Sequence, residues 1–476
     1  MPQSNPSTFF DITRSQYQDK ALFDQAKSYA FEYLKTIHNP AALKTDDRPV
    51  YPDPDTLNAL DTFDEPFPKE LGNGQQILEM LHTIGSPATV AQTGGRYFGF
   101  VNGAAFPAAL AAKWLADVWD QNAAMNVTSP VAAKLEAVCE SWLKEIFNLP
   151  DSTVAGFVSG TSAATLCGLL AARNRILANM EWDVREKGLF NAPKPRVILG
   201  EQAHSTVFKA LSLIGFGSQD LELIPVDSHG RMKVDQLPDI DETCLVIAQA
   251  GNVNTGAFDN LYKICDRASR AWVHVDGAFG LWAAGSPSYA HLTRGIEKAD
   301  SWSVDAHKTL NAPYDCGIVL CRHPEDMITA LQNTGDYIIY SDKRDPMLYT
   351  PEMSRRARGI DLWATLKYLG KSGLTSLVDH LCDMAKLLGK DLKNQGFTIH
   401  NDVEFNQVLL SCPKEETTKK MLDLIQADGT CWCGNSMWQG KTAIRISVCS
   451  WATTKADVAA TAEAFIRARK KAEKQN

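Results

Sequence analysis

The chain has 476 residues, of which 45% are hydrophobic, so it can bury a large core and is too long for one small domain. Its 48 basic and 56 acidic residues give a formal charge of −8, which argues against a nucleic-acid-binding surface. No apolar run reaches the roughly 18 residues of a membrane span, and the first twenty residues lack a signal-peptide pattern. We therefore expect a cytoplasmic protein without nucleic-acid or membrane partners.

The eleven cysteines are scattered, and most lie inside apolar segments, as small core residues do. Cys431 and Cys433 are one residue apart, which is not the two-residue gap of common zinc and redox pairs. The sequence therefore predicts reduced thiols and no metal site.

Residues 1–90 are predicted to form a helical extension. Two amphipathic segments, 20–37 and 72–85, bracket a loop that is rich in aspartate and proline. Their apolar faces need a surface to pack against.

The hydrophobic pattern changes in residues 91–345, where short apolar segments alternate with helical ones. Helical spacing is found at 129–147, 162–177, 205–215 and 261–270. The strand-like segments are 154–160, 196–201, 221–226, 244–251, 272–277, 301–306 and 317–322. This alternation predicts an α/β domain with a mostly parallel sheet of seven strands and helices on both faces.

Residues 346–476 are predicted to form a smaller α+β domain. A long helical segment, 361–396, precedes strand-like segments at 405–412 and 443–450. The last helix is expected to start after Thr454, because Asp457 three residues on completes a capping-box pattern.

The stretch SVDAHKTLNAPYDCG, residues 303–317, places Lys308 between two segments that resemble buried strands. A single lysine at a strand end is usually a solvated surface residue. In a poorly solvated pocket, however, its neutral amine is favoured, and that form suits a covalent bond to a carbonyl.

Three further features stand beside predicted strands. Thr161 and Ser162 begin an alanine-rich helix, whose free N–H groups suit a phosphate. Asp276 ends a buried-type strand and needs a cationic partner, such as a protonated pyridine nitrogen. His204 follows another strand and could stack on a flat ring or pass a proton. Each feature alone has an ordinary explanation, but together they match what pyridoxal phosphate requires at the carboxyl ends of strands.

The motif HVDGAFG, residues 274–280, followed by DAHKTLNAPYDCG, residues 305–317, resembles the group II pyridoxal-phosphate-dependent amino acid decarboxylases. The resemblance extends from about residue 94 to 454. It implies the pyridoxal-phosphate-dependent transferase fold type I. It also implies a homodimer whose active sites lie at the subunit interface, with residues 1–90 exchanged between subunits.

The resemblance also implies roles for individual positions. Lys308 would hold pyridoxal 5'-phosphate covalently, and Asp276 would pair with its ring nitrogen. His204 and Ala278 would contact opposite faces of the ring, and Arg445 would face the substrate α-carboxylate. The phosphate would be held by Thr161, Ser162 and His307.

The resemblance assigns two further roles less directly. Asn252 stands beside the cofactor where many relatives have threonine. Tyr337, 29 positions after Lys308, falls on the mobile-loop tyrosine that many relatives use as proton donor. Tyr340 is close enough to take that role, and either tyrosine could simply pack in its loop.

The implied reaction is α-decarboxylation of an L-amino acid to the amine and CO2. Tyr97 and Phe98 could wall an aromatic pocket or simply pack. Arg355, Arg356 and Arg358 could meet an acidic side chain or form ion pairs at a subunit interface. An aromatic substrate is favoured only by its frequency in the family. A carbon–carbon lyase or aldolase, a decarboxylating oxidative deaminase and a non-catalytic scaffold remain as alternatives.

Overall fold

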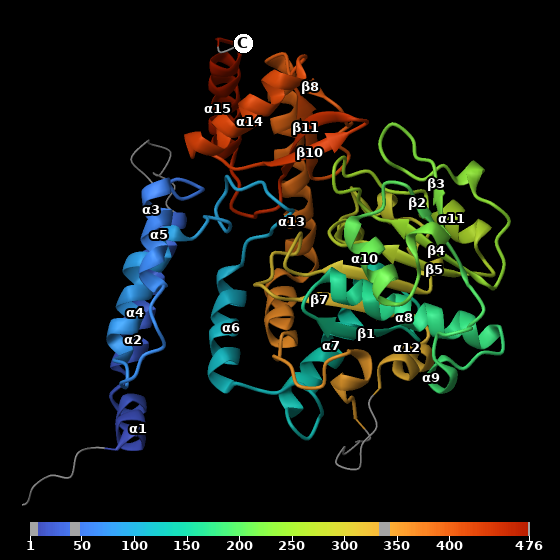
Figure 1. Ribbon diagram of the computed structural model, residues 1–476, viewed down its shortest axis with the longest axis horizontal. Coiled ribbons are helices and arrows are strands. Elements are labelled where there is room, and N and C mark those ends of the chain that lie inside the picture. The colour runs from blue at the N-terminus through green and yellow to red at the C-terminus, as the bar shows by residue number, and fades with distance from the viewer. Residues whose placement is uncertain (1–7, 39–47, 333–342, 475–476) are drawn as a thin grey trace, which may run out of the picture.

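The structure is a computed structural model that describes residues 8–38, 48–332 and 343–474. An arm of helices lies along one side of the molecule, a large sheet fills its centre, and a smaller sheet and two helices lie at one end (Figure 1). The predicted boundaries near residues 90 and 345 remain predictions.

The N-terminal arm contains no buried helical residue. Its first helix begins with a capping box in which Thr8 and Asp11 satisfy each other's backbone N–H groups. Its helices are α1 (Phe9–Asp19), α2 (Ala21–Ile37), α3 (Pro54–Asn58), α4 (Gly74–Met80) and α5 (Ser86–Ala88).

The central sheet has seven strands in the order β1-β7-β6-β5-β4-β2-β3. β7 is antiparallel to both of its neighbours, and the other paired strands are parallel. The strands are β1 (Val154–Val158), β2 (Arg196–Gly200), β3 (Leu221–Ile224), β4 (Cys244–Gln249), β5 (Trp272–Asp276), β6 (Ser301–Asp305) and β7 (Gly317–Cys321). Each lies within a predicted segment, so the mostly parallel sheet of seven strands is confirmed.

Helices cover both faces of this sheet, which is why its strands are apolar on both sides. Along β2, Val197 and Leu199 enter the core under α8 and α10, whereas Ile198 enters the core on the opposite face with α7. The helices of this region are α6 (Pro107–Trp119), α7 (Pro130–Phe147), α8 (Thr161–Asn179), α9 (Val184–Lys187), α10 (Ser205–Leu213), α11 (Leu261–Arg267) and α12 (Pro324–Leu331).

The C-terminal region carries a second, antiparallel sheet in the order β10-β11-β9-β8. The predicted capping box is present, since Thr454 N donates to Asp457 Oδ2 at 2.8 Å and Asp457 N to Thr454 Oγ1 at 3.2 Å. The elements are α13 (Gly359–Asn394), β8 (Thr398–Ile399), β9 (Gln407–Ser411), α14 (Glu415–Asp428), β10 (Gly434–Trp438), β11 (Lys441–Ser447) and α15 (Lys455–Lys474). This α+β arrangement agrees with the expectation, although β8 and β10 were not predicted.

All eleven cysteines are buried and unpaired. Among the described residues, no helix has the length and apolar character that crossing a bilayer requires. Within the same residues, no cluster of three or more His, Cys, Asp or Glu side chains could hold a metal ion.

His274 of β5 is fully buried and bonded to two serines, with Nδ1 2.8 Å from Ser301 Oγ and Nε2 3.3 Å from Ser303 Oγ. Burial lowers the pKa of this imidazole from 6.5 to about 3. As the pH falls from 6.5 towards 3, the unfolded chain therefore binds a proton that the folded chain excludes. The contribution of the neutral His274 to the free energy of unfolding is fully present above pH 6.5. It should fall by about 1.4 kcal/mol for each pH unit between pH 6.5 and 3.

The His274→Asn variant isolates this effect, because its amide can bond a serine and cannot titrate. Urea unfolding at pH 6.5, 5.5 and 4.5 should show the parent losing stability faster than the variant. Equal losses in both proteins would contradict the assignment.

Candidate active site

The carboxyl ends of the central strands bring four predicted residues to one place. Lys308 lies in the connection between β6 and β7, Asp276 ends β5, His204 caps α10 after β2, and Thr161 begins α8 after β1. They line one cavity of about 470 Å³, together with Arg445 from β11. Other predicted residues lining this cavity are Ser162, Ala278 and His307.

Asp305, the last residue of β6, organises the lysine end of this cavity. Its Oδ2 lies 3.1 Å from Lys308 Nζ, and its Oδ1 accepts a 2.7 Å hydrogen bond from Thr161 N. His307 lies beside it, with Nε2 3.6 Å from Asp305 Oδ1, while its Nδ1 accepts from Cys316 N. One buried carboxylate therefore ties the lysine to the start of α8.

Asp276 is buried, and its carboxylate accepts only one hydrogen bond from the described residues, from Ala278 N at 3.2 Å. Burial raises the pKa of this carboxyl, and the attraction of His204 and Lys308 opposes that rise. A cation placed against Asp276 would favour its charged form, as the pairing with a pyridinium nitrogen requires.

His204 is held by its own helix. Its Nδ1 lies 2.7 Å from Thr206 Oγ1 and accepts from Thr206 N at 3.3 Å. Burial lowers the pKa of the ring, so the neutral form is favoured. Because Nδ1 is an acceptor, the neutral ring carries its proton on Nε2.

Two fully buried polar atoms of the cavity lack partners among the described residues. The Thr161 hydroxyl at the start of α8 is buried and unbonded, and so is Nε of Arg445. Burial lowers the pKa of Arg445, so an anionic partner would stabilise its charge. These groups suit two anions, a phosphate at the helix N-terminus and a carboxylate at the arginine.

A tight turn, residues 99–103, packs directly on the lysine segment. Gly103 N donates to His307 O at 3.1 Å, and a Cβ on Gly103 would lie 2.1 Å from Lys308 O. Phe100 and Val101 adopt left-handed conformations, with φ of 51° and 58°. Such strain in a β-branched residue is rare and is found most often at functional sites.

This turn forms one wall of the cavity together with the end of the lysine segment. Phe100 lines the cavity and stacks on Trp432 at 5.5 Å between ring centroids. Tyr314 stacks on His307 at 4.1 Å, and its hydroxyl donates to Asn102 Oδ1 at 2.9 Å. The exposed aromatic surface of the site comes from Phe100 and Tyr314.

Several predicted residues do not line this cavity. Tyr97 stacks on Trp432, and Phe98 lies in the core of the C-terminal region. The aromatic wall expected from these two residues is instead formed by Phe100, because the strained turn changes which side chains face the site. Asn252 lies in the turn next to the cavity, where its Oδ1 accepts from Asn254 N and Thr255 N.

The three arginines form ion pairs within the chain. Arg355 pairs with Glu136, and Arg358 with Asp315. Arg356 bonds both Asp315 and Asp361. None of the three lines the cavity. Tyr337 and Tyr340 lie outside the described residues.

Sequence reasoning did not predict several residues that line the cavity, among them Phe100, Thr206, Gln249 and Tyr314. Tyr314 belongs to the motif at residues 305–317, and Phe100 lies two positions after Phe98, so both were close to residues already singled out. Gln249 pairs in register with Asp276 on the neighbouring strand, which only the sheet order reveals.

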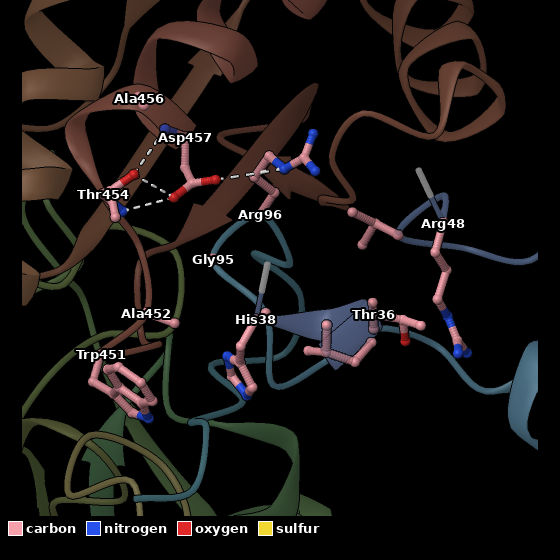
Figure 2. A pocket seen from close by; sticks show the side chains of 14 residues that line it. Thr36, His38, Arg48, Gly95, Arg96, Trp451, Ala452, Thr454, Ala456 and Asp457 are labelled. Carbon is pink, nitrogen blue, oxygen red and sulfur yellow. Dashed lines mark hydrogen bonds and ion pairs between the residues drawn. The ribbon is translucent and has the colours of Figure 1, made fainter. Parts of the chain in front are cut away.

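A different cavity, of about 350 Å³, lies where the N-terminal arm meets the start of α15 (Figure 2). Arg96 Nε lies 3.5 Å from Asp457 Oδ1, and Thr454 bonds the same carboxylate. Arg48, which also lines this cavity, donates to the carbonyl oxygens of Ser86 and Thr89. His38 stacks on Trp451. It holds no lysine, so the cavity around Lys308 is the candidate active site.

Comparison with known proteins agrees with this site. The family model described as the pyridoxal-dependent decarboxylase conserved domain matches residues 54–412, which is most of the chain. The chain belongs to the pyridoxal-dependent decarboxylase family. Pyridoxal phosphate is thus its cofactor, and the unpaired groups around Lys308 fit that molecule.

Individual members of the family are distant. An aromatic-L-amino-acid decarboxylase of Bacillus atrophaeus is 31% identical over 52% of this chain and 53% of its own length, so the match spans about half of that relative. The enzyme of the same name from Manduca sexta is 28% identical over 70% of each chain. The crystal structure of Oryza sativa TDC with PLP and tryptamine has a TM-score of 0.85 at 21% identity, covering 98% of this chain and 99% of that one. This likeness confirms the fold.

Proposed function

We propose that this protein removes the α-carboxylate of an L-amino acid as CO2 and releases the amine. The observation that carries the proposal is the convergence of Lys308, Asp276 and Arg445 on one cavity in a member of a decarboxylase family. Lys308 is placed to hold the cofactor, and Arg445 to bind an anion on the substrate.

Each residue has a task that its surroundings support. Bound pyridoxal phosphate supplies an electron sink for the electron pair that remains when CO2 leaves. Asp276 keeps the positive charge of the ring nitrogen in place, and Arg445 orients the departing carboxylate. His204, neutral with its proton on Nε2, and Ala278 would contact the cofactor's ring. Thr161, Ser162 and His307 would hold its phosphate, and Asn252 orders the neighbouring turn.

Product analysis tests the reaction. The purified protein with pyridoxal phosphate is incubated with the twenty amino acids, DOPA, diaminobutyrate and phosphonoalanine. Amine and CO2 in equal amounts support the proposal. Aldehyde with ammonia would indicate an oxidative deaminase instead, and an aldol product would indicate a carbon–carbon lyase.

We further propose that the substrate is aromatic. Phe100 and Tyr314 present rings to the cavity, while Arg355, Arg356 and Arg358 are bound to carboxylates of the chain and cannot serve an acidic side chain. Values of kcat/KM for tryptophan, tyrosine and phenylalanine should exceed those for glutamate and aspartate. A preference for the acidic substrates would contradict this assignment.

Tyr337 is the proposed proton donor to Cα after CO2 leaves. The Tyr337→Phe variant should bind cofactor and substrate normally, with amine formation reduced by about 10²–10⁴-fold because a general acid is lost. Amine and aldehyde are quantified by chromatography. Tyr340→Phe is the control, and if that variant alone loses amine formation, Tyr340 is the donor. Full activity in both variants would leave His204 as the next candidate.

The protein is proposed to act as a cytoplasmic homodimer. The arm exposes large apolar side chains, among them Phe10, Phe23 and Phe31. None of the residues in its two long helices is buried. A second subunit would cover this surface. Light scattering at assay concentration should give twice the chain mass, and an active, stable monomer would refute the dimer.

A further inference from the structure

Gln249, the last residue of β4, lies next to Asp276 on the neighbouring parallel strand. The two residues are paired in register, so their side chains leave the same face of the sheet. Both line the cavity that contains Lys308. The position of Gln249 therefore places an amide group beside the carboxylate that faces the cofactor's ring nitrogen.

Both backbone polar groups of Gln249 form hydrogen bonds with Asp259. Its N–H donates to Asp259 Oδ2 at 2.8 Å, and its carbonyl accepts from Asp259 N at 3.0 Å. In contrast, its side-chain amide forms no hydrogen bond with any described residue. The backbone of Gln249 is therefore held in place, while its side-chain amide is available to bond a group in the cavity.

Asp276 needs such a partner. Its carboxylate is buried and accepts a single hydrogen bond from the described residues, from Ala278 N, which is long for a charged acceptor. An additional N–H donor would favour the ionised carboxylate over the neutral acid. Asp276 must be ionised to pair with a protonated ring nitrogen.

A chamber of about 10 Å³ lies behind this pair and is lined by Gln249, Asp276, Asp259 and His204. That volume is close to the minimum that holds one water molecule, and the polar lining supplies the partners such a water requires. The Gln249 amide and the Asp276 carboxylate form no direct hydrogen bond in this structure, and a water in the chamber would bridge them.

We propose that Gln249 is a positioning residue that donates a hydrogen bond to Asp276, directly or through this water, and thereby keeps the cofactor's ring nitrogen protonated. The inference rests on cofactor binding and is independent of which amino acid the enzyme uses.

The test compares the resting holoenzyme of the parent with the Gln249→Leu variant, which removes the amide and keeps the side-chain size. With pyridoxal phosphate labelled with nitrogen-15, NMR reports the protonation of the ring nitrogen directly. The parent should show a protonated nitrogen, and the variant a shift towards the neutral form with about tenfold weaker cofactor binding. Gln202→Leu is the matched control, because Gln202 borders the same chamber but is not paired with Asp276.

An unchanged nitrogen-15 shift in Gln249→Leu would overturn the proposal, as would an unprotonated nitrogen in the parent. A variant that alters only the KM for the amino acid would instead assign Gln249 to the substrate. If Gln249→Leu does not fold, a crystal structure of the parent holoenzyme decides. It must show Gln249 Nε2 within hydrogen-bond distance of Asp276 or of a water that also bonds Asp276, and the absence of both contacts refutes the role. No substrate is present in the nitrogen-15 and crystallographic experiments, so their outcome does not depend on the proposed decarboxylation.

Discussion

Replacement of Lys308 by alanine should abolish covalent attachment of pyridoxal phosphate and lower turnover by about 10⁴-fold, the upper range for loss of one positioned catalytic group. The reason is chemical, because no other lysine lines the cavity. Borohydride reduction of the parent followed by peptide mapping should place the pyridoxyl group on the peptide that contains Lys308, and the variant should carry none.

Lys298→Ala is the matched control. Lys298 lies ten positions earlier, on the surface, and pairs with Asp266 at 3.8 Å. This variant should keep both label and activity. Label retained in Lys308→Ala, or found on another lysine in the parent, would refute the assignment.

Asp276→Asn should lower turnover by about 10²–10³-fold, comparable with removing one preorganised electrostatic group from an active site. Asparagine has the same size and can still accept from Ala278 N, so the cavity keeps its shape. It lacks the charge that stabilises a protonated ring nitrogen. Steady-state kinetics with the best substrate, combined with borohydride labelling, separate this loss from a loss of attachment at Lys308.

Asp227→Asn provides the comparison for Asp276→Asn. Asp227 belongs to a turn near β3, where it bonds Arg231 and lies outside the cavity. Its loss should leave turnover within about twofold, as for most surface changes. If Asp276→Asn retains half or more of the parent turnover, the pairing with the ring nitrogen is wrong.

The sequence alone predicted the central sheet because each of its strands is buried on both faces and therefore appears as an uninterrupted apolar segment. It also brought Lys308, Asp276 and His204 together, since polar residues at the carboxyl ends of such strands meet at one edge of the sheet. The edge strand β10 was missed for the opposite reason. Its first four residues alternate between half-buried and exposed positions, only Trp438 is buried, and the strand contains no apolar run.

The aromatic wall could not be predicted from residue type. Residues 97, 98 and 100 are all aromatic, and only the left-handed conformations of Phe100 and Val101 decide which ring faces the cavity. The ion-pair partners of Arg355, Arg356 and Arg358 could not be predicted either. Their carboxylate partners Glu136, Asp315 and Asp361 come from distant parts of the chain, so the pairing depends on the tertiary fold.

The turn at residues 99–103 has a consequence for how this enzyme could change over evolution. The groups proposed to serve the cofactor lie at the ends of core strands and at the starts of helices, where most substitutions would disturb the sheet. Phe100 and Tyr314 stand on loops, with about half of each side chain exposed. Their exchange can alter the ring that is accepted while the cofactor site stays intact. Gly103 limits that freedom, since any side chain there collides with the backbone of Lys308. Substrate range can therefore diverge on this scaffold one wall residue at a time, as long as residue 103 remains glycine.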